Sequence, residues 1–256
     1  SLRFDQRNSK LEKQDTKITQ YWLVLTLRKR VRVALPVVFG ERQKQFIEEA
    51  LQGECGIKTV EMVKRDGEWY ANFVLEREIE TNENYETIIG VDLGERNVTA
   101  AVAISRDNPS KPMKGQFWSG SKIRAIRGKY NHIRRNLQRK KRIDLVKRIG
   151  TREERKANHE LHKIAKQVVE YAKQFKNPVI VMENLKNIRE RMNYGKKQNK
   201  KLHAWAFRKL QNYIEYKARL EGIPVVYVSP KNTTRTCHRC GYVQKAVNGR
   251  EFKCQK

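Results

Sequence analysis

Acidic side chains are scarce in this sequence. Asp and Glu together number 28 and Lys and Arg number 56, so the formal net charge of the 256-residue chain is +28. A field of that strength favours a polyanionic partner, usually a nucleic acid. A membrane surface is the competing interpretation, but no apolar run approaches a spanning length and no signal peptide is visible. We therefore expect a nucleic-acid partner and no membrane.

Cysteine is scarce as well, and its placement is informative. Four cysteines, three of them clustered near the end of the sequence, do not make a disulfide framework. Cys237 and Cys240 form a C-x-x-C knuckle, and Cys254 follows after thirteen residues, a spacing typical of a zinc ribbon. A C-x-x-C pair can instead be a redox motif, but the third cysteine favours Zn²⁺. Cys55 stands alone and is expected to be structural, and the reducing setting is the cytosol or nucleoid.

The N-terminal part of the chain carries the signals of a small β-rich domain with one helix. Strands are predicted at Tyr21–Leu27 and Val31–Val38, and Asp66-Gly67 between two apolar runs indicates a hairpin. Between these strand regions, Glu41–Leu51 has the spacing of a short amphipathic helix. A polar segment follows, so we assign this first domain to residues 1–82.

Strands and helices alternate from residue 83 to residue 230. Apolar strands are predicted within Thr87–Ser105, at Pro178–Leu185 and at Pro224–Pro230. Helices are predicted from Ser121 onward, around Ala157–Phe175 and at Leu202–Leu220. This alternation is typical of an α/β fold with a mixed sheet. Residues 231–256 form the third predicted domain, the zinc ribbon.

Two acids interrupt the apolar strands. Asp92 follows Ile88, Ile89 and Val91, and Glu183 closes the run that begins at Pro178. A carboxylate buried in a strand is costly unless a metal or hydrogen bonds compensate it, although a strand end can also let it reach water. Two carboxylates at strand ends of one sheet can bind a hard divalent cation such as Mg²⁺. A third carboxylate is expected for such chemistry, yet no Asp follows Asp144.

The basic residues form the candidate nucleic-acid-binding set. Its members are Arg134, Arg135, Arg139, Lys140, Lys141, Arg142, Arg148, Lys196, Lys197 and Arg235. Charge runs are often only solvated faces, but with so few acids the self-repulsion here would go unrelieved without a polyanion. Contacts of this kind position a phosphate backbone and do not read base sequence.

From about Trp69 onward the chain resembles TnpB, the transposon-encoded RNA-guided nuclease, and its type V CRISPR effector relatives. The resemblance rests on three blocks in order, GVDLGERNVTAAVAIS, IVMENLKNIR and LHAWAFRKLQNYIEYKARLEGIPVVYVSPKNTTRTCHRCGY. It implies an RNase H-like (RuvC) core that carries a zinc-ribbon insertion and follows a β-rich, wedge-like domain. It also implies that Asp92 and Glu183 are the first and second catalytic acids and hold two Mg²⁺ ions. Guide RNA and double-stranded DNA are the implied partners, and a prokaryotic cytoplasm with nucleoid association is the implied location.

The same resemblance places a fourth zinc-binding cysteine and the third catalytic acid after Lys256, and a recognition lobe before Ser1. On this basis the sequence predicts a chain shortened at both ends that does not cut DNA as it stands. The alternative is a non-catalytic nucleic-acid-binding module or regulator derived from the same family. A purely structural zinc-ribbon adaptor fits the charge but leaves Asp92 unexplained.

Overall fold

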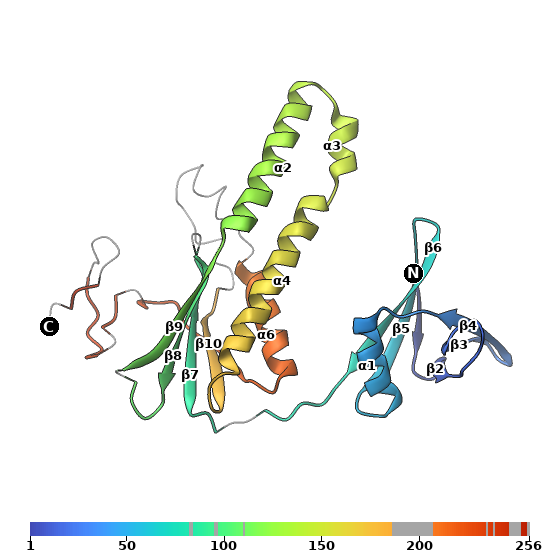
Figure 1. Ribbon diagram of the computed structural model, residues 1–256, viewed down its shortest axis with the longest axis horizontal. Helices are drawn as coiled ribbons and strands as arrows, with labels where there is room; N and C mark the ends of the chain where they lie inside the picture. Colours follow the sequence, from blue (N-terminus) through green and yellow to red (C-terminus); the bar gives the residue numbers. More distant parts are fainter. Residues whose placement is uncertain are drawn as a thin grey trace. The chain divides into compact units, whose positions relative to one another are not determined.

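The computed structural model describes most of the chain as two compact units, Ser1–Ile79 and Glu80–Lys256 (Figure 1). The described residues are 1–81, 84–94, 97–109, 111–185, 207–233, 235–237, 239–245 and 252–254. The boundary between the units falls after Ile79, close to the predicted boundary after residue 82. No helix among these residues is long and apolar enough to cross a membrane.

The first unit is β-rich and contains one helix, as its sequence pattern predicts. One three-stranded sheet has the order β1-β5-β6 and the other has the order β2-β3-β4. Its elements are β1 (Leu2–Asp5), β2 (Ser9–Lys13), β3 (Tyr21–Arg28), β4 (Val31–Val37), α1 (Glu41–Leu51), β5 (Gly56–Arg65) and β6 (Glu68–Glu76). Buried Leu23, Leu25 and Val60 form a core to which both sheets contribute. The predicted hairpin joins β5 to β6 through Asp66 and Gly67, which have φ values of 51° and 90°.

The second unit is built on a five-stranded mixed sheet. The strand order is β11-β10-β7-β8-β9, in which β10 runs parallel to β7 and β11, and β8 runs antiparallel to β7 and β9. The strands are β7 (Thr87–Asp92), β8 (Asn97–Ser105), β9 (Pro112–Ser119), β10 (Pro178–Glu183) and β11 (Val225–Val228). The α/β fold with a mixed sheet is therefore confirmed.

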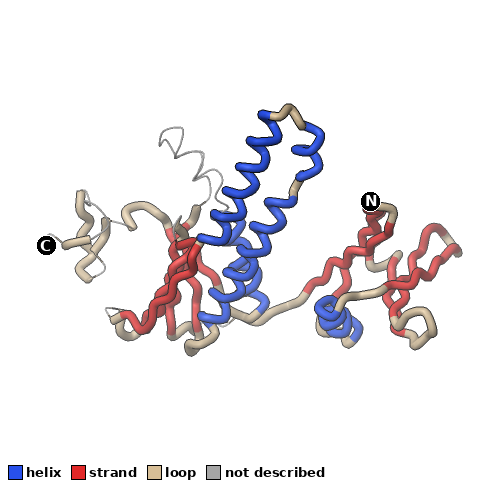
Figure 2. The backbone as a smooth tube through the Cα atoms, turned by 45° about the horizontal axis from the view of Figure 1, so that its top comes forward, coloured by secondary structure: helices blue, strands red, loops and turns tan. Residues whose placement is uncertain are grey.

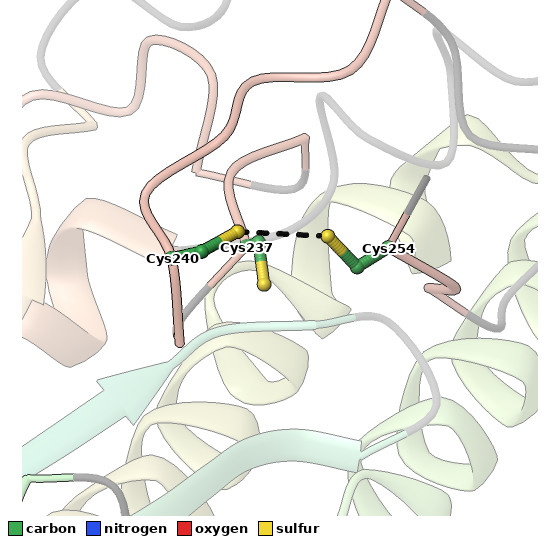
Figure 3. Close-up of side chains that lie close together, drawn as sticks. All are labelled: Cys237, Cys240 and Cys254. Atoms are coloured by element: carbon green, nitrogen blue, oxygen red, sulfur yellow. Dashed lines mark hydrogen bonds between the residues drawn. The ribbon is translucent and has the colours of Figure 1, made fainter. Parts of the chain in front are cut away.

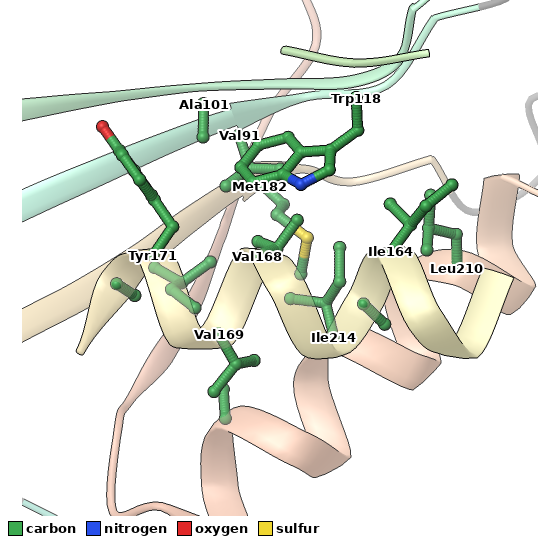
Figure 4. Packing of buried hydrophobic residues seen from close by; sticks show 14 of the residues in the cluster. Val91, Ala101, Trp118, Ile164, Val168, Val169, Tyr171, Met182, Leu210 and Ile214 are labelled. Atoms are coloured by element: carbon green, nitrogen blue, oxygen red, sulfur yellow. The ribbon is translucent and has the colours of Figure 1, made fainter. Parts of the chain in front are cut away.

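Helices pack against this sheet through a continuous apolar core (Figures 1 and 4). They are α2 (Ser121–Arg139), α4 (Arg152–Ala172) and α6 (Phe207–Leu220), whereas α3 (Ile143–Ile149) has no buried residue and contacts α2. Side chains of the strands, such as Val91 and Trp118, point toward α4, where Tyr171 packs edge-on against Trp118 at 5.9 Å between ring centroids (Figure 4). The Tyr171 hydroxyl also donates a 2.7 Å hydrogen bond to the carbonyl oxygen of Lys114. The core thus fixes the sheet, and with it the strand ends that carry the predicted acids.

Helices α2 and α4 lie side by side and extend beyond the sheet, with α3 at their far end (Figures 1 and 2). We call α2, α3 and α4 together the basic hairpin. The chain leaves α2 through Lys141, which has a φ of 53°, and enters α4 after Gly150, which has a φ of 48°. Two left-handed residues therefore separate α3 from the helices on either side, a division that the sequence pattern did not predict.

Candidate metal and nucleic-acid sites

Asp92 and Glu183 are the last residues of two neighbouring parallel strands. Strand β7 ends at Asp92, strand β10 ends at Glu183, and the residues immediately before them, Val91 and Met182, are register partners. Paired strands lie about 4.8 Å apart, so the two acids leave the sheet side by side. The structure brings the two predicted acids together.

The two carboxyl groups have different surroundings. Asp92 is exposed, and its carbonyl oxygen accepts a 3.1 Å hydrogen bond from the Thr99 hydroxyl. Glu183 is half-buried, and its Oε1 accepts a 2.6 Å hydrogen bond from Thr233 Oγ1. Of the two alternatives that the sequence left open, the second holds for Asp92: the strand ends there and the residue is exposed to water.

Neither carboxylate forms an ion pair with a described basic residue, although the chain holds 56 Lys and Arg. Most of the other described acids of this unit do form such pairs, for example Glu153 with Arg134 and Glu154 with Lys209. Oxygen donors that are not neutralised by a side-chain cation fit a hard divalent ion such as Mg²⁺. Asp92 and Glu183 are the residues that would hold it.

The three predicted zinc ligands converge at the C-terminal end of the described chain (Figure 3). The Sγ atoms of Cys237, Cys240 and Cys254 all lie within 4.8 Å of one another. Those of Cys240 and Cys254 are 3.6 Å apart. A tetrahedral zinc ion with Zn–S bonds of 2.3 Å places its sulfur ligands about 3.8 Å apart, so the cluster fits a structural zinc site.

A short hydrogen-bonded turn shapes the knuckle. Gly241 has a φ of 70°, and its amide donates to the Cys237 carbonyl oxygen at 2.9 Å. The Cys237 amide donates to the Tyr242 carbonyl oxygen at 2.8 Å. Gln244 Nε2 donates to the Lys253 carbonyl oxygen at 2.6 Å and so ties the segment that carries Cys254 to the knuckle.

The same turn activates one thiol. Hydrogen bonds from the backbone amides of Cys240 and Arg239 lower the pKa of the Cys237 thiol to about 7. Amides that point at a sulfur favour its thiolate, which is the form that binds a metal. The knuckle therefore offers Cys237 to zinc in its binding form near neutral pH.

The cations predicted to contact phosphate differ in whether a described acid already pairs with them. Arg135, Arg139, Lys140, Lys141 and Arg148 lie exposed on the basic hairpin, and no described acid forms an ion pair with them. Arg134 instead pairs with Glu153 of α4, and Arg142 pairs with Asp144 at 3.0 Å. The free cations, and not the paired ones, are the ones available to a phosphate backbone.

The remaining predicted cations lie elsewhere. Arg235 belongs to the root of the ribbon, where its guanidinium donates to the Lys245 carbonyl oxygen at 3.0 Å and to the Asn232 side chain. Lys196 and Lys197 lie outside the described residues. Arg235 therefore has a structural role in the ribbon, which its sequence context did not indicate.

Sequence reasoning missed two residues beside Glu183. Thr233 contacts its carboxylate, and Gln211 Nε2 donates to its carbonyl oxygen at 2.6 Å. A signal for Gln211 was present, because this amide interrupts the apolar stripe formed by Leu210, Ile214 and Ala218 on α6. Thr233 gave no comparable signal, since its contact joins residues fifty positions apart.

Comparisons with known proteins show what this chain is similar to. Residues 207–256 match the family described as Cas12f1-like, TNB domain. The TnpB-like protein MJ0751 of Methanocaldococcus jannaschii is 31% identical over 229 residues, which cover 87% of this chain and 79% of that protein. A CRISPR-associated endodeoxyribonuclease Cas12f2 of a Micrarchaeota archaeon is 34% identical over 68% of this chain and 32% of its own length.

A solved structure shares the fold. The chain in a cryo-EM structure of a Cas12f1-sgRNA-target DNA complex has a TM-score of 0.67 at 17% identity, and the match covers 99% of this chain. This chain spans 56% of that one, so it corresponds to about half of the larger protein. The 31% identity to MJ0751 extends over 79% of that protein, and residues 207–256 match a Cas12f1-like domain. This chain therefore belongs to the TnpB-like family, which is related to the Cas12f effectors of type V CRISPR systems.

Proposed function

We propose that this chain supplies the nuclease core of an RNA-guided DNA endonuclease that hydrolyses phosphodiester bonds with Mg²⁺. The observation that carries the proposal is the pair formed by Asp92 and Glu183, side by side at the ends of β7 and β10 without a described cationic partner. When bound, Mg²⁺ activates water and stabilises the leaving oxygen of the phosphodiester. The two carboxylates hold the ions, and the exposed cations of the basic hairpin hold a phosphate backbone.

The domain assignments are part of the same proposal. Residues 83–230 form a RuvC-like core of the RNase H type, since the mixed sheet carries its acids on the first and fourth strands of the unit. Residues 1–82 form a wedge-like domain, and residues 231–256 form a zinc ribbon that contacts the target nucleic acid. Guide RNA and double-stranded target DNA are the partners, by analogy with the sgRNA and target DNA of the solved Cas12f1 complex. The location that follows is a prokaryotic cytoplasm.

The test is cleavage of plasmid DNA that carries a target matched to the bound guide RNA. The protein with its bound guide RNA is compared on a matched and on an unmatched plasmid, each in Mg²⁺ and in EDTA. We expect it to cut only the matched plasmid, and only in Mg²⁺. Cleavage that ignores the guide sequence or survives EDTA contradicts the proposal.

The second candidate function is sequence-guided binding without cleavage. It is favoured by the exposed cations of the basic hairpin, which no described acid pairs with and which can hold a phosphate backbone without any cleavage. In the same assay it predicts that neither plasmid is cut, although the protein still retards matched DNA in a salt-dependent way.

The basic hairpin allows a separate prediction about binding. Replacing Arg139, Lys140 and Lys141 by glutamine should weaken nucleic-acid binding and lower the slope of log K against log salt by about 2 to 3, because each lost phosphate contact removes about 0.9. The measurement is a fluorescence-anisotropy titration at several salt concentrations.

Arg134→Gln is the matched control for this prediction. Because Glu153 already pairs with Arg134, we expect this variant to lower the melting temperature and to leave the salt slope nearly unchanged. Equal slope changes in the control and in the triple variant would show that the exposed cations are not the phosphate contacts.

A further inference from the structure

We propose that Thr233 and Gln211 are positioning residues that hold Glu183 in its metal-binding orientation, and that Thr233 thereby links the zinc ribbon to the nuclease site. The inference rests on the proposed function, because it assigns Glu183 to a metal. It concerns the side chain and the main chain of Glu183 separately. Thr233 acts on the carboxylate, and Gln211 acts on the backbone that carries it.

Thr233 holds one oxygen of the Glu183 carboxylate. Its hydroxyl lies 2.6 Å from Glu183 Oε1 and 3.2 Å from the Pro230 carbonyl oxygen. A hydroxyl has one proton, and the shorter contact to a charged acceptor is the stronger one, so the proton is directed to Glu183. Among the described residues nothing else donates to this carboxylate, and its other oxygen is left for a cation.

Gln211 holds the Glu183 main chain from within the core. Its side chain has no exposed surface, and Nε2 donates to the Glu183 carbonyl oxygen at 2.6 Å. Only the amide nitrogen can donate to a carbonyl, so the orientation of the amide is fixed. This orientation leaves Oε1 buried without a hydrogen-bond partner among the described residues.

An unpaired buried acceptor is destabilising, so packing alone does not explain a glutamine at this position. An apolar side chain of similar volume would fill the same space on α6 without that cost. The gain that offsets the cost is the fixed backbone at the end of β10. We infer that Gln211 serves the geometry of Glu183 and not the stability of the fold.

Thr233 belongs to a turn that leads directly into the zinc knuckle. The amides of Arg235 and Thr236 both donate to the Asn232 carbonyl oxygen, at 2.9 and 3.0 Å. Thr236 then pairs with Val243 across the knuckle that carries Cys237. Backbone hydrogen bonds from Arg235 and Thr236 to Asn232 therefore tie the root of the ribbon to the residue that precedes Thr233, whose hydroxyl contacts Glu183.

The test is a titration of the full chain with Mn²⁺ as the probe, followed by EPR of the free ion, in the absence of any nucleic acid. We expect Thr233→Val to weaken Mn²⁺ binding by about tenfold, in the range found for residues that orient metal ligands, and Thr233→Ser to restore it. Gln211→Met should also weaken binding while the melting temperature stays close to that of the parent chain. Thr236→Val is the matched control, because its hydroxyl contacts Asn232 and not Glu183.

The variant Asp92→Asn separates the two claims. If the parent chain binds Mn²⁺ and Asp92→Asn abolishes binding, the metal site exists, and unchanged binding by Thr233→Val and Gln211→Met then overturns the positioning inference alone. If Asp92→Asn binds Mn²⁺ as well as the parent chain does, the metal site itself is contradicted and both claims fail. If Thr236→Val weakens Mn²⁺ binding as much as Thr233→Val does, the inference is also overturned. The effect would then come from disturbing the turn and not from losing the hydrogen bond between Thr233 and Glu183.

Discussion

Replacing Asp92 by asparagine should reduce target-DNA cleavage by the guide-RNA complex by about 10³-fold or more. The reason is that the metal then no longer supplies several kcal/mol of transition-state stabilisation. Asparagine keeps the size of the side chain but removes the charge that attracts the cation. Asp92 is exposed at the end of β7, so the change should leave the core and the melting temperature unaffected. Single-turnover cleavage of matched plasmid, with DNA binding measured in parallel, provides the test.

Asp107→Asn is the matched control for this first prediction. Asp107 is an exposed acid of the same unit. It lies just after the C-terminal end of β8, whereas Asp92 pairs with Ala100 near the N-terminal end of that strand. We expect this variant to cut at the parent rate. A comparable loss of cleavage rate in both variants would mean that the effect comes from net charge. Cleavage by Asp92→Asn at the parent rate would show that Asp92 does not take part in the reaction.

The second large effect is expected at the knuckle, where Cys237→Ser should abolish zinc binding and unfold the ribbon. Structural zinc contributes about 10–16 kcal/mol to the folding of small ribbon-like domains, and Cys237 is the buried ligand of the three. With three thiolates the fourth tetrahedral position is open to water or to a further thiolate. Zinc content by mass spectrometry and amide chemical shifts of residues 235–245 report the result.

Cys55→Ser is the control for the zinc prediction. Cys55 is a buried cysteine of the first unit and lies outside the cluster. We expect this variant to keep the zinc stoichiometry of the parent chain. If Cys237→Ser retains zinc while Cys55→Ser loses it, the assignment of the three ligands is wrong.

Much of the fold was predictable because its pattern is local. Local residue patterns predict the apolar strands β3, β7 and β10 and the amphipathic helices α1 and α4. Strands β1, β2 and β9 do not show such a pattern, because their sequences LRFD, SKLEK and PMKGQFWS hold few buried residues and no run of apolar side chains. The break before α3 depends on Lys141 adopting a left-handed conformation, for which its residue type gives no signal.

The candidate site was predictable to the same extent, because local patterns identify its acids but not its contacts between distant segments. Acids that close apolar strands identify Asp92 and Glu183, and parallel pairing then places them together. Contacts between distant segments were not predictable: the pair of Arg134 with Glu153 and the hydrogen bond from Thr233 to Glu183 both appear only once the chain is folded. Sequence therefore identified the candidate ligands but not the residues that orient them.

The most direct test of the central claim, that Asp92 and Glu183 belong to one metal site, is cleavage of the polypeptide itself by a redox-active ion at that site. Fe²⁺ is bound in place of Mg²⁺, ascorbate and hydrogen peroxide generate hydroxyl radicals there, and mass spectrometry locates the backbone cuts. The account predicts cuts near residue 92 and near residue 183 together, and the loss of both when Asp92 is replaced by asparagine. Cuts near Glu183 that persist unchanged in the Asp92→Asn variant, or cuts that fall elsewhere, would contradict a shared metal site.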